Sequence, residues 1–474
     1  MKDGMKSRVF ILAVMAMAAV SFSACGSGSG GSSAPPPSNA NEWTWMSGAN
    51  VVRQWGTYGA LGTASPSNVP GAREQAVSWS DASGNFWLFG GNGFDSAGGD
   101  GFLNDLWKYS SGQWTWMGGS STVNQPGVYG TLLQAASGNI PGARNSEVRW
   151  TDASGNFWLF GGGYEPADTV YYFNDLWEYS PSTSQWTWMG GSSAMDQPGV
   201  YGSPGQAAST NIPGGRFHDV SWKDSSGNFW LFGGNALDAS GTLGHLNDLW
   251  EYNVSTGEWT WMGGPSLASE AGIGIYGTQG KPSSSNIPGG REQASGWTDA
   301  SGNFWLFGGN GYDSAGTYGF LNDLWEYSPS AGQWTWVGGP SVVNQPATYG
   351  TQGTAASGNI PGARNACANW LDASGNFWLF GGYFHNWTTG QISYLNDLWR
   401  YSGGEWTWMG GSTADNQSGV YGTLGTAGSG NIPGSRHYSV TWIDRSGNLW
   451  LFGGNAFDST GTRDYINDLW KYEP

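Results

Sequence analysis

The chain has 474 residues, among them 81 glycines and 32 tryptophans, but only 18 lysines and arginines against 35 aspartates and glutamates. A formal net charge of −17 leaves no broad cationic surface, which excludes nucleic acid and an anionic lipid surface as main partners. Hydrophobic residues make up 38% of the chain and aromatic residues 15%, so most of the chain has enough apolar material to fold around a core.

The first 24 residues have the layout of a secretory signal. Basic residues precede an apolar run over 9–20 that is too short to span a bilayer permanently. The next residues, Phe-Ser-Ala-Cys at 22–25, resemble a bacterial lipobox. That resemblance implies that Cys25 is lipidated and becomes the first mature residue. Residues 25–42 are then a Gly/Ser/Pro tether that holds the rest of the chain off a membrane surface.

The signal predicts a bacterial cell-envelope protein. Gly26 is permissive for the outer membrane under the sorting pattern of such lipoproteins, so we expect an outer-membrane lipoprotein. The alternative is ordinary signal cleavage, which would give a secreted or periplasmic protein. Once the signal is removed, Cys367 is the one cysteine besides the anchor, so no intramolecular disulfide is expected.

Six units of about 72 residues follow from residue 43 onward. Each unit contains PGxR, then WLFGG, then NDLW, and a WTW motif stands before the first unit and after every NDLW except the last. We expect four strands per unit. Strand A follows PGxR, a DxSGN turn leads into strand B at WLFGG, NDLWxY is strand C, and WTWM is strand D.

The four strands with a double glycine closing the second resemble the kelch motif over residues 43–474, although kelch units are usually about 50 residues long. The resemblance implies a β-propeller with one blade per unit. The last unit ends after strand C, so the strand around Trp43 is expected to complete its sheet. The predicted fold is an all-β, six-bladed kelch-type β-propeller closed by the N-terminal strand.

Chain direction in such a blade puts the A–B and C–D turns on one face and the long B–C and D–A loops on the other. We expect binding on the long-loop face, because loops on a rigid scaffold usually carry function. Thirty tryptophans recur in every unit and are assigned to packing between blades. Trp55 and Trp387 break the pattern and lie in long loops, as do His245 and His385.

The PGxR arginines allow two interpretations. They begin strand A on the long-loop face, where the NDLW aspartates begin strand C, and the double glycine leaves the gap between them open. Each arginine either reaches an aspartate of its own or a neighbouring unit or belongs to a cationic ring that receives an acidic ligand. In the second case the ligand-binding residues are Arg73, Arg144, Arg216, Arg291, Arg364 and Arg436, with Trp55, Trp387, His245 and His385.

Two kelch enzymes offer alternatives. Galactose oxidase holds copper with two tyrosines and two histidines, one tyrosine being crosslinked to cysteine. Here the histidines are scattered and show no short ligand spacing, and Cys367 falls inside a strand. The bacterial periplasmic N-acetylneuraminate epimerase is also six-bladed. A similar activity would use as nominal acid–base groups Glu74, Glu292, His218 and His437.

No motif singles out a catalytic residue. We therefore predict a non-catalytic, surface-tethered scaffold that recognises a protein or a glycan through its long-loop face. It is expected to be a monomeric propeller that uses no cofactor and no metal. The carbohydrate-active enzyme and, behind it, the copper enzyme remain the alternatives.

Overall fold

The structure is a computed structural model that describes residues 40–474 except residues 269, 271 and 388. The proposed signal, Cys25 and nearly all of the tether lie outside the described residues. Within the described part of the chain, no helix is long and apolar enough to cross a membrane. The first strand begins at Glu42, one residue before the boundary expected between tether and fold.

Each unit forms a four-stranded antiparallel sheet in the expected strand order. The sheets of the described units are β3 (Val77–Ser80), β4 (Phe86–Phe89), β7 (Leu106–Ser110) and β8 (Gln113–Gly118); β9 (Val148–Thr151), β10 (Phe157–Phe160), β13 (Leu176–Ser180) and β14 (Gln185–Gly190); β16 (Val220–Lys223), β17 (Phe229–Phe232), β20 (Leu249–Asn253) and β21 (Glu258–Gly263); β23 (Ser295–Thr298), β24 (Phe304–Tyr312), β25 (Tyr318–Ser328) and β26 (Gln333–Gly338); β27 (Ala368–Leu371), β28 (Phe377–Asn386), β29 (Gln391–Ser402) and β30 (Glu405–Gly410); and β32 (Val440–Ile443), β33 (Leu449–Phe452), β36 (Leu469–Glu473) and β1 (Glu42–Ser47).

The long B–C segments and the residues at the PGxR arginine form short extra strands beside these sheets. In the fourth and fifth units, β24–β25 and β28–β29 run through as long hairpins, and β22 (Arg291–Glu292) pairs with β24. Elsewhere the extra strands are separate, and a 3-10 turn, η1 (Pro166–Asp168), stands in the second unit. The separate strands are β2 (Arg73–Glu74), β5 (Asn92–Phe94) and β6 (Asp100–Phe102); β11 (Gly163–Tyr164) and β12 (Tyr171–Tyr172); β15 (Arg216–Phe217), β18 (Asn235–Leu237) and β19 (Leu243–His245); and β31 (Arg436–His437), β34 (Asn455–Phe457) and β35 (Arg463–Tyr465).

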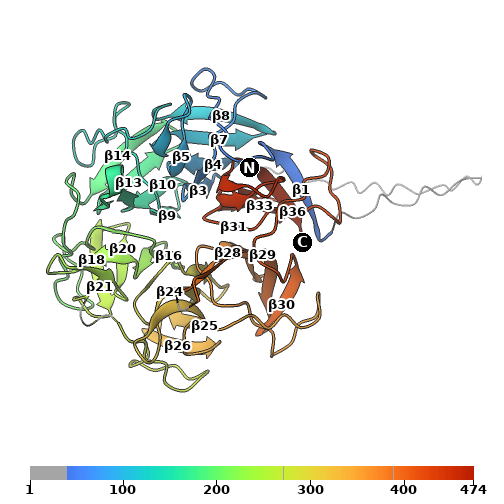
Figure 1. Cartoon of the computed structure of the whole chain (residues 1–474). Helices are drawn as coiled ribbons and strands as arrows, with labels where there is room; N and C mark the ends of the chain where they lie inside the picture. The colour runs from blue at the N-terminus through green and yellow to red at the C-terminus, as the bar shows by residue number, and fades with distance from the viewer. Residues whose placement is uncertain (1–39, 269, 271, 388) are drawn as a thin grey trace, which may run out of the picture. The chain divides into compact units, whose positions relative to one another are not determined.

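The sheets stand around a common axis, with β3, β9 and β16 at the inner ends of their sheets (Figure 1). The inner strands touch in a closed cycle, β3–β9–β16–β23–β27–β32 and back to β3. The N-terminal strand β1 pairs antiparallel with β36, with Trp43 opposite Tyr472. The described chain is therefore an all-β fold of four-stranded antiparallel sheets in the arrangement of a β-propeller.

Repeated tryptophans join each sheet to the next. The indole of Trp79, at the end of the first strand A, stacks on Phe157 of the second unit with ring centroids 5.3 Å apart. Its N–H donates to the carbonyl of Trp150, 3.1 Å away. The same stack joins Trp150 to Phe229, and three further pairs repeat the contact. The recurring tryptophans therefore serve packing between sheets.

Strand A differs from the prediction, because it is broken in two. The residue two places after the PGxR arginine has a positive φ, between 53° and 63°, although none of the six is glycine. Its N–H donates to the carbonyl of the equivalent residue in the preceding unit, at 2.9 to 3.3 Å. This closed ring of backbone hydrogen bonds surrounds the axis, and its members are Gln75, Ser146, His218, Gln293, Ala366 and Tyr438.

If β1 is an integral strand of the last sheet, Trp43 should be costly to truncate. Trp43 is 5% exposed, whereas Trp55, a few residues on, is 60% exposed. We expect Trp43→Ala to lower the free energy of unfolding by about 3–5 kcal/mol and Trp55→Ala to change it by less than about 0.5 kcal/mol. Denaturant unfolding measures both, and equal losses in the two variants would contradict the placement of β1.

Candidate functional site

The six PGxR arginines lie inside the fold. Each is at most 1% exposed and pairs with the NDLW aspartate of its own unit at 2.6 to 2.9 Å. In the third unit, both terminal nitrogens of Arg216 donate to Asp248, and Nε donates to the carbonyl of Gly214. One of those nitrogens also reaches the carbonyl of Gly233, the first of the double glycine, at 2.9 Å. All three nitrogens of the guanidinium are thus engaged.

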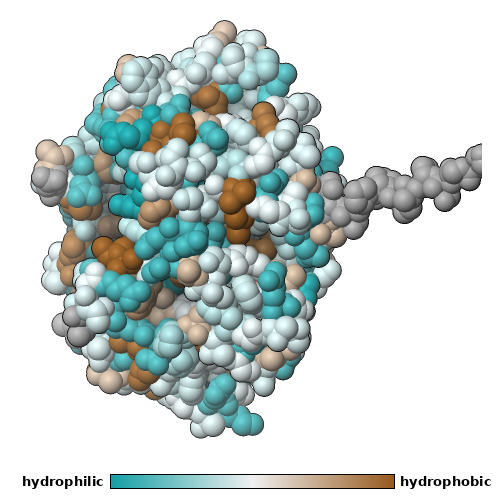
Figure 2. Space-filling model, turned by 45° about the vertical axis from the view of Figure 1, so that its right-hand side comes forward, coloured by the Kyte–Doolittle hydropathy of each residue, from teal (hydrophilic) through white to brown (hydrophobic). Residues whose placement is uncertain are grey.

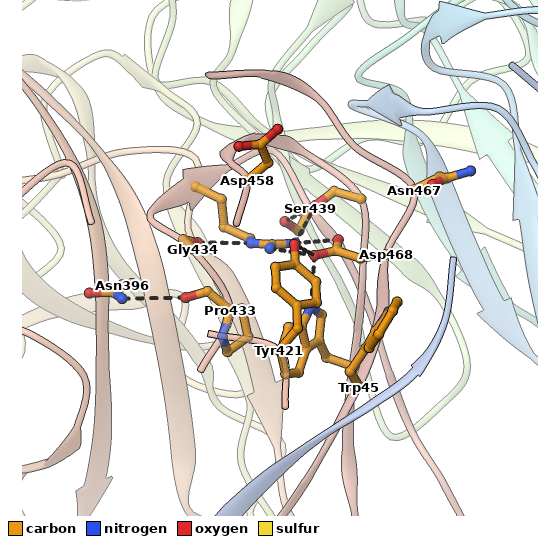
Figure 3. Close-up of polar contacts among 12 residues, drawn as sticks. Trp45, Asn396, Tyr421, Pro433, Gly434, Ser439, Asp458, Asn467 and Asp468 are labelled. Carbon is orange, nitrogen blue, oxygen red and sulfur yellow. Dashed lines mark hydrogen bonds and ion pairs between the residues drawn. The ribbon is translucent and has the colours of Figure 1, made fainter. Parts of the chain in front are cut away.

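Two more donors complete this network. The tyrosine of the D–A segment and the tryptophan of NDLW both donate to the aspartate, for example Tyr201 and Trp250 to Asp248 at 2.7 Å each. Figure 3 shows the arrangement in the last unit, where the Tyr421 hydroxyl reaches Asp468. The network repeats in every unit, so the arginines do not form an open cationic ring. Their charge is neutralised within the fold, which corrects the interpretation of them as ligand-binding groups.

A different set of polar residues gathers at the axis on the long-loop side. We call it the axial cluster, and it consists of Gln75, His218, His245, Glu292, Gln293, Tyr318 and Tyr438. Glu292 is its centre. His218 Nδ1 lies 3.2 Å from one carboxylate oxygen, and His245 Nε2 lies 3.4 Å from the other. The cluster thus joins residues of different units, with His218 74 positions and His245 47 positions before Glu292.

Amides and hydroxyls hold the two histidines in place. His218 Nε2 lies 2.9 Å from the side-chain nitrogen of Gln75, and His245 Nε2 lies 2.9 Å from the hydroxyl of Tyr318. Gln293 contacts His218 and donates to the Tyr438 hydroxyl. Each position two residues after PGxR belongs to the hydrogen-bonded ring, so the backbone itself fixes four members of the cluster, Gln75, His218, Gln293 and Tyr438, at the axis.

A second acid–histidine pair stands beside the cluster. Glu74 Oε2 lies 4.0 Å from His437 Nε2. The ring of Tyr438 packs between the two pairs: its centroid is 4.5 Å from that of His437 and 5.6 Å from that of His218. The four acid–base residues named from the sequence, Glu74, His218, Glu292 and His437, are therefore brought together.

The two carboxyls differ in protonation. Burial raises the pKa of Glu74 to about 8, outweighing the attraction of Arg463. Burial acts on Glu292 too, but hydrogen bonds and charge from His218 and His245 outweigh it and lower its pKa to about 2. Burial also lowers the pKa of His437 to about 3. At neutral pH the site thus holds an ionised Glu292, a protonated Glu74 and a neutral His437.

The other candidate residues lie apart from Glu292. Trp55 is 60% exposed and Trp387 is 58% exposed. His385 stacks against Trp387 with ring centroids 3.8 Å apart. A cavity of about 490 Å³ in the same unit is lined by Phe384, Ser393 and Asp415. Of the loop histidines, only His245 therefore contacts Glu292 directly.

Sequence reasoning missed four cluster members, Gln75, Gln293, Tyr318 and Tyr438. A signal was available for Gln75, Gln293 and Tyr438, because the first three residues after PGxR differ between units while the motifs PGxR, WLFGG and NDLW repeat. Residues that repeat in every unit stabilise the fold. Positions that differ between units are therefore the ones that can form a specific binding or catalytic site.

The described residues hold no group of three or more His, Cys, Asp or Glu able to bind a metal ion. Cys367 is a partly buried thiol whose Sγ lies 3.6 Å from the carbonyl of Asn365. Burial raises the pKa of this thiol to about 12, so it is a poor nucleophile at neutral pH.

Comparison with known proteins adds little on function. No protein-family model and no curated protein matches the chain. A solved structure titled "Structure of YjhT" is similar at 14% identity and a TM-score of 0.49, covering 85% of this chain and 95% of that chain. A likeness of this size says nothing about activity, so function must be inferred from the residues of the site.

The buried arginine–aspartate pairs are expected to stabilise the fold strongly. Arg216→Met leaves Asp248 as a buried, unpaired charge, so we expect a loss of about 3–5 kcal/mol of unfolding free energy. Tyr201→Phe removes one hydrogen bond to the same aspartate and should cost about 1–2 kcal/mol. Thermal unfolding of both variants tests this, and an Arg216→Met protein of wild-type stability would show that the pairing is not needed.

The raised pKa of Glu74 predicts that the free energy of unfolding depends on pH. Its folded-state pKa of about 8 lies above its ordinary value of 4.5, so the stability it contributes is present below pH 4.5 and is lost as pH rises toward 8. Glu74→Gln should therefore match the wild type at pH 5 and exceed it at pH 8.5 by more than about 1.4 kcal/mol, the equivalent of one pKa unit.

Glu292→Gln provides the opposite sign as a control, because the pKa of Glu292 is lowered. Its stabilising effect is present above pH 4.5 and disappears as pH falls toward 2. Chemical denaturation across the pH series measures both differences. A Glu74→Gln difference that is the same at pH 5 and pH 8.5 would contradict the placement of Glu74 in a buried, uncompensated position.

Proposed function

We propose that this chain is a six-bladed, kelch-type β-propeller, closed by its N-terminal strand, that binds a glycan without catalysis at the axial cluster. The observation that carries the proposal is the contact of Glu292 with His218 and His245 inside a shell of amides and hydroxyls. The four-stranded sheets and the closed ring of backbone hydrogen bonds support the propeller part of the proposal.

The chemistry of the cluster suits a sugar. Carboxylate, amide, imidazole and phenol groups can accept from and donate to ring hydroxyls, and Tyr438 offers an aromatic ring beside them. The ionised Glu292 is a strong acceptor for a hydroxyl group. A few convergent polar groups on a rigid scaffold are typical of sites for small polar ligands.

A protein partner is supported less well. Protein interfaces usually have an apolar, aromatic centre. Large hydrophobic residues are exposed on this protein, but in the view of Figure 2 they form separate patches between polar areas. The polar cluster at the axis therefore favours a glycan over a protein among the two ligand classes expected from the sequence.

The lipidated Cys25 and the tether before residue 43 complete the proposal. They would hold the propeller at the bacterial outer membrane, with its ligand site free to meet envelope or external glycans. The protein would act as a monomer and require no cofactor.

A carbohydrate-active enzyme is the second candidate. Two carboxyls whose environments move their pKa values in opposite directions are the arrangement that general acid–base catalysis uses. Here Glu74 is protonated and Glu292 ionised at neutral pH, and Tyr438 lies between their histidines. Such a pair is suited to moving a proton to and from a sugar carbon or ring oxygen, as an epimerase requires.

A thermal-shift screen of residues 40–474 against neutral sugars, sialic acids and uronic acids tests the proposal. A sugar at 100 times its dissociation constant should stabilise the protein by about 2.7 kcal/mol. Glu292→Gln should reduce that affinity at least tenfold. The matched control is Glu326→Gln, which makes the same change at a half-buried carboxyl of β25 that accepts from Asn303.

A flat screen, or equal affinity in the Glu292→Gln variant, would refute glycan binding at the cluster and favour a protein partner. Proton NMR of the bound sugar separates the two candidates that remain. An unchanged sugar supports a binding scaffold, whereas epimerisation that stops in Glu292→Gln would replace it with the enzyme.

A further inference from the structure

A second cavity opens along the axis on the face of the short A–B turns. It has a volume of about 430 Å³ and is lined by the inner strands of all the units, β3, β9, β16, β23, β27 and β32. We call it the channel cavity. The axial cluster belongs to the long-loop side, and none of its residues lines the channel cavity.

One residue breaks the repeat pattern inside this cavity. Five positions after each PGxR arginine, the inner strand presents a small or neutral side chain in every unit but one. The residues at this register are Ser78, Arg149, Ser221, Gly296, Asn369 and Thr441. Arg149 lies in the middle of β9, opposite Leu159 of β10, so its position is fixed by the sheet.

Arg149 has no counter-charge. Its guanidinium takes part in no hydrogen bond or ion pair with the described residues, whereas each PGxR arginine pairs with an aspartate. No aspartate or glutamate lines the channel cavity. Burial lowers the pKa of Arg149 to about 10 and is the sole cause of that shift, so the group stays protonated at neutral pH. Five N–H donors therefore face the cavity with nothing to receive them.

The carboxyls that share a cavity with Arg149 do not supply a counter-charge. This smaller cavity, of about 200 Å³, lies against the hydrogen-bonded ring. Arg149 lines it together with Glu147, Asp219 and four residues of the axial cluster. Burial raises the pKa of Glu147 to about 8 and the pKa of Asp219 well above its ordinary value. Glu147 is thus mostly protonated at neutral pH, burial disfavours the ionised form of Asp219, and neither carboxyl forms an ion pair with Arg149.

Other groups in the channel cavity are suited to an anion. Lys223 brings a second cation, with its ammonium 2.8 Å from the carbonyl of Thr151. The hydroxyls of Ser80, Thr151 and Thr441 line the cavity and make no side-chain hydrogen bond among the described residues, so they are free to donate. A guanidinium with hydroxyls and an ammonium around it is a typical setting for oxyanions.

We propose that the channel cavity binds a small oxyanion, a carboxylate or a phosphate group, on the guanidinium of Arg149. The negative charge of the whole chain repels anions at long range, so binding depends on these local donors. It is selective for oxyanions over chloride, because only an oxyanion matches the two parallel N–H groups of the guanidinium.

Thermal unfolding in phosphate and in acetate, each compared with sodium chloride of the same ionic strength, tests the proposal. We expect one or both anions to raise the melting temperature of the wild type with a saturable dependence. Arg149→Gln should weaken that apparent affinity at least tenfold. Arg445→Gln, which removes an exposed arginine beside an A–B turn of the same face, should leave it unchanged.

The stability of the variant without added anion is a second readout. Arg149→Gln should be at least as stable as the wild type, since it removes a charge that has no partner. A phosphate response alone assigns a phosphate ligand, and an acetate response alone assigns a carboxylate ligand. No stabilisation of the wild type beyond chloride, or the same response in Arg149→Gln, overturns the proposal.

If Arg149→Gln does not fold, Arg149→Lys tests the role of the guanidinium in anion binding. It retains the charge but loses the paired N–H groups of the guanidinium, so affinity for the responding anion should fall at least threefold. An Arg149→Lys protein that binds the anion as well as the wild type would overturn the role of the guanidinium.

Discussion

The buried arginine–aspartate pair is the interaction on which the rest of this fold depends. In the first unit, Arg73 begins strand A, Asp105 precedes strand C, the carbonyl of Gly90 ends strand B, and Tyr58 comes from the D–A segment. One pair thus fixes four chain segments relative to one another. The cost of burying two charges is offset because both partners are fully hydrogen-bonded. The glycines after strand B are needed because both have positive φ, and an added Cβ would meet backbone carbonyls, that of Arg144 at 3.0 Å from Gly90 and that of Glu74 at 2.6 Å from Gly91.

Because the repeated arginines and aspartates pair with one another, a specific site must be formed by other residues. The repeated arginines, tyrosines and tryptophans are committed to packing within and between sheets, so they are the same in every unit and cannot distinguish one site from another. Side chains that differ between units occur at positions outside this packing. Positions one and two after the PGxR arginine build the acid–histidine pairs and the axial cluster, and position five places Arg149 in the channel.

The repeated parts of the structure could be predicted from the sequence. The four strands of each unit, the turn at Asp81 and the reach of each arginine over the double glycine follow from motifs that recur with constant spacing. The break in strand A was not predictable, because residues such as Gln75 and Tyr438 rarely adopt a positive φ and no glycine marks the site. The axial cluster was missed as a unit because its members come from different repeats and meet only when the ring is formed.

The two ends of the axis have opposite electrostatic character, and the ring of backbone hydrogen bonds separates them. On the long-loop side, Glu292 is ionised and stabilised by two histidines. On the short-turn side, Arg149 is charged and has no ion-pair partner in the part of the chain that the structure describes. The six backbone hydrogen bonds between them involve residues held at a strained φ by sheets on every side. The two ends meet in the small cavity against this ring, which is lined by Arg149, Glu147 and His218. Burial raises the pKa of Glu147 to about 8 there, so the protonation of Glu147 depends on the charges at both ends.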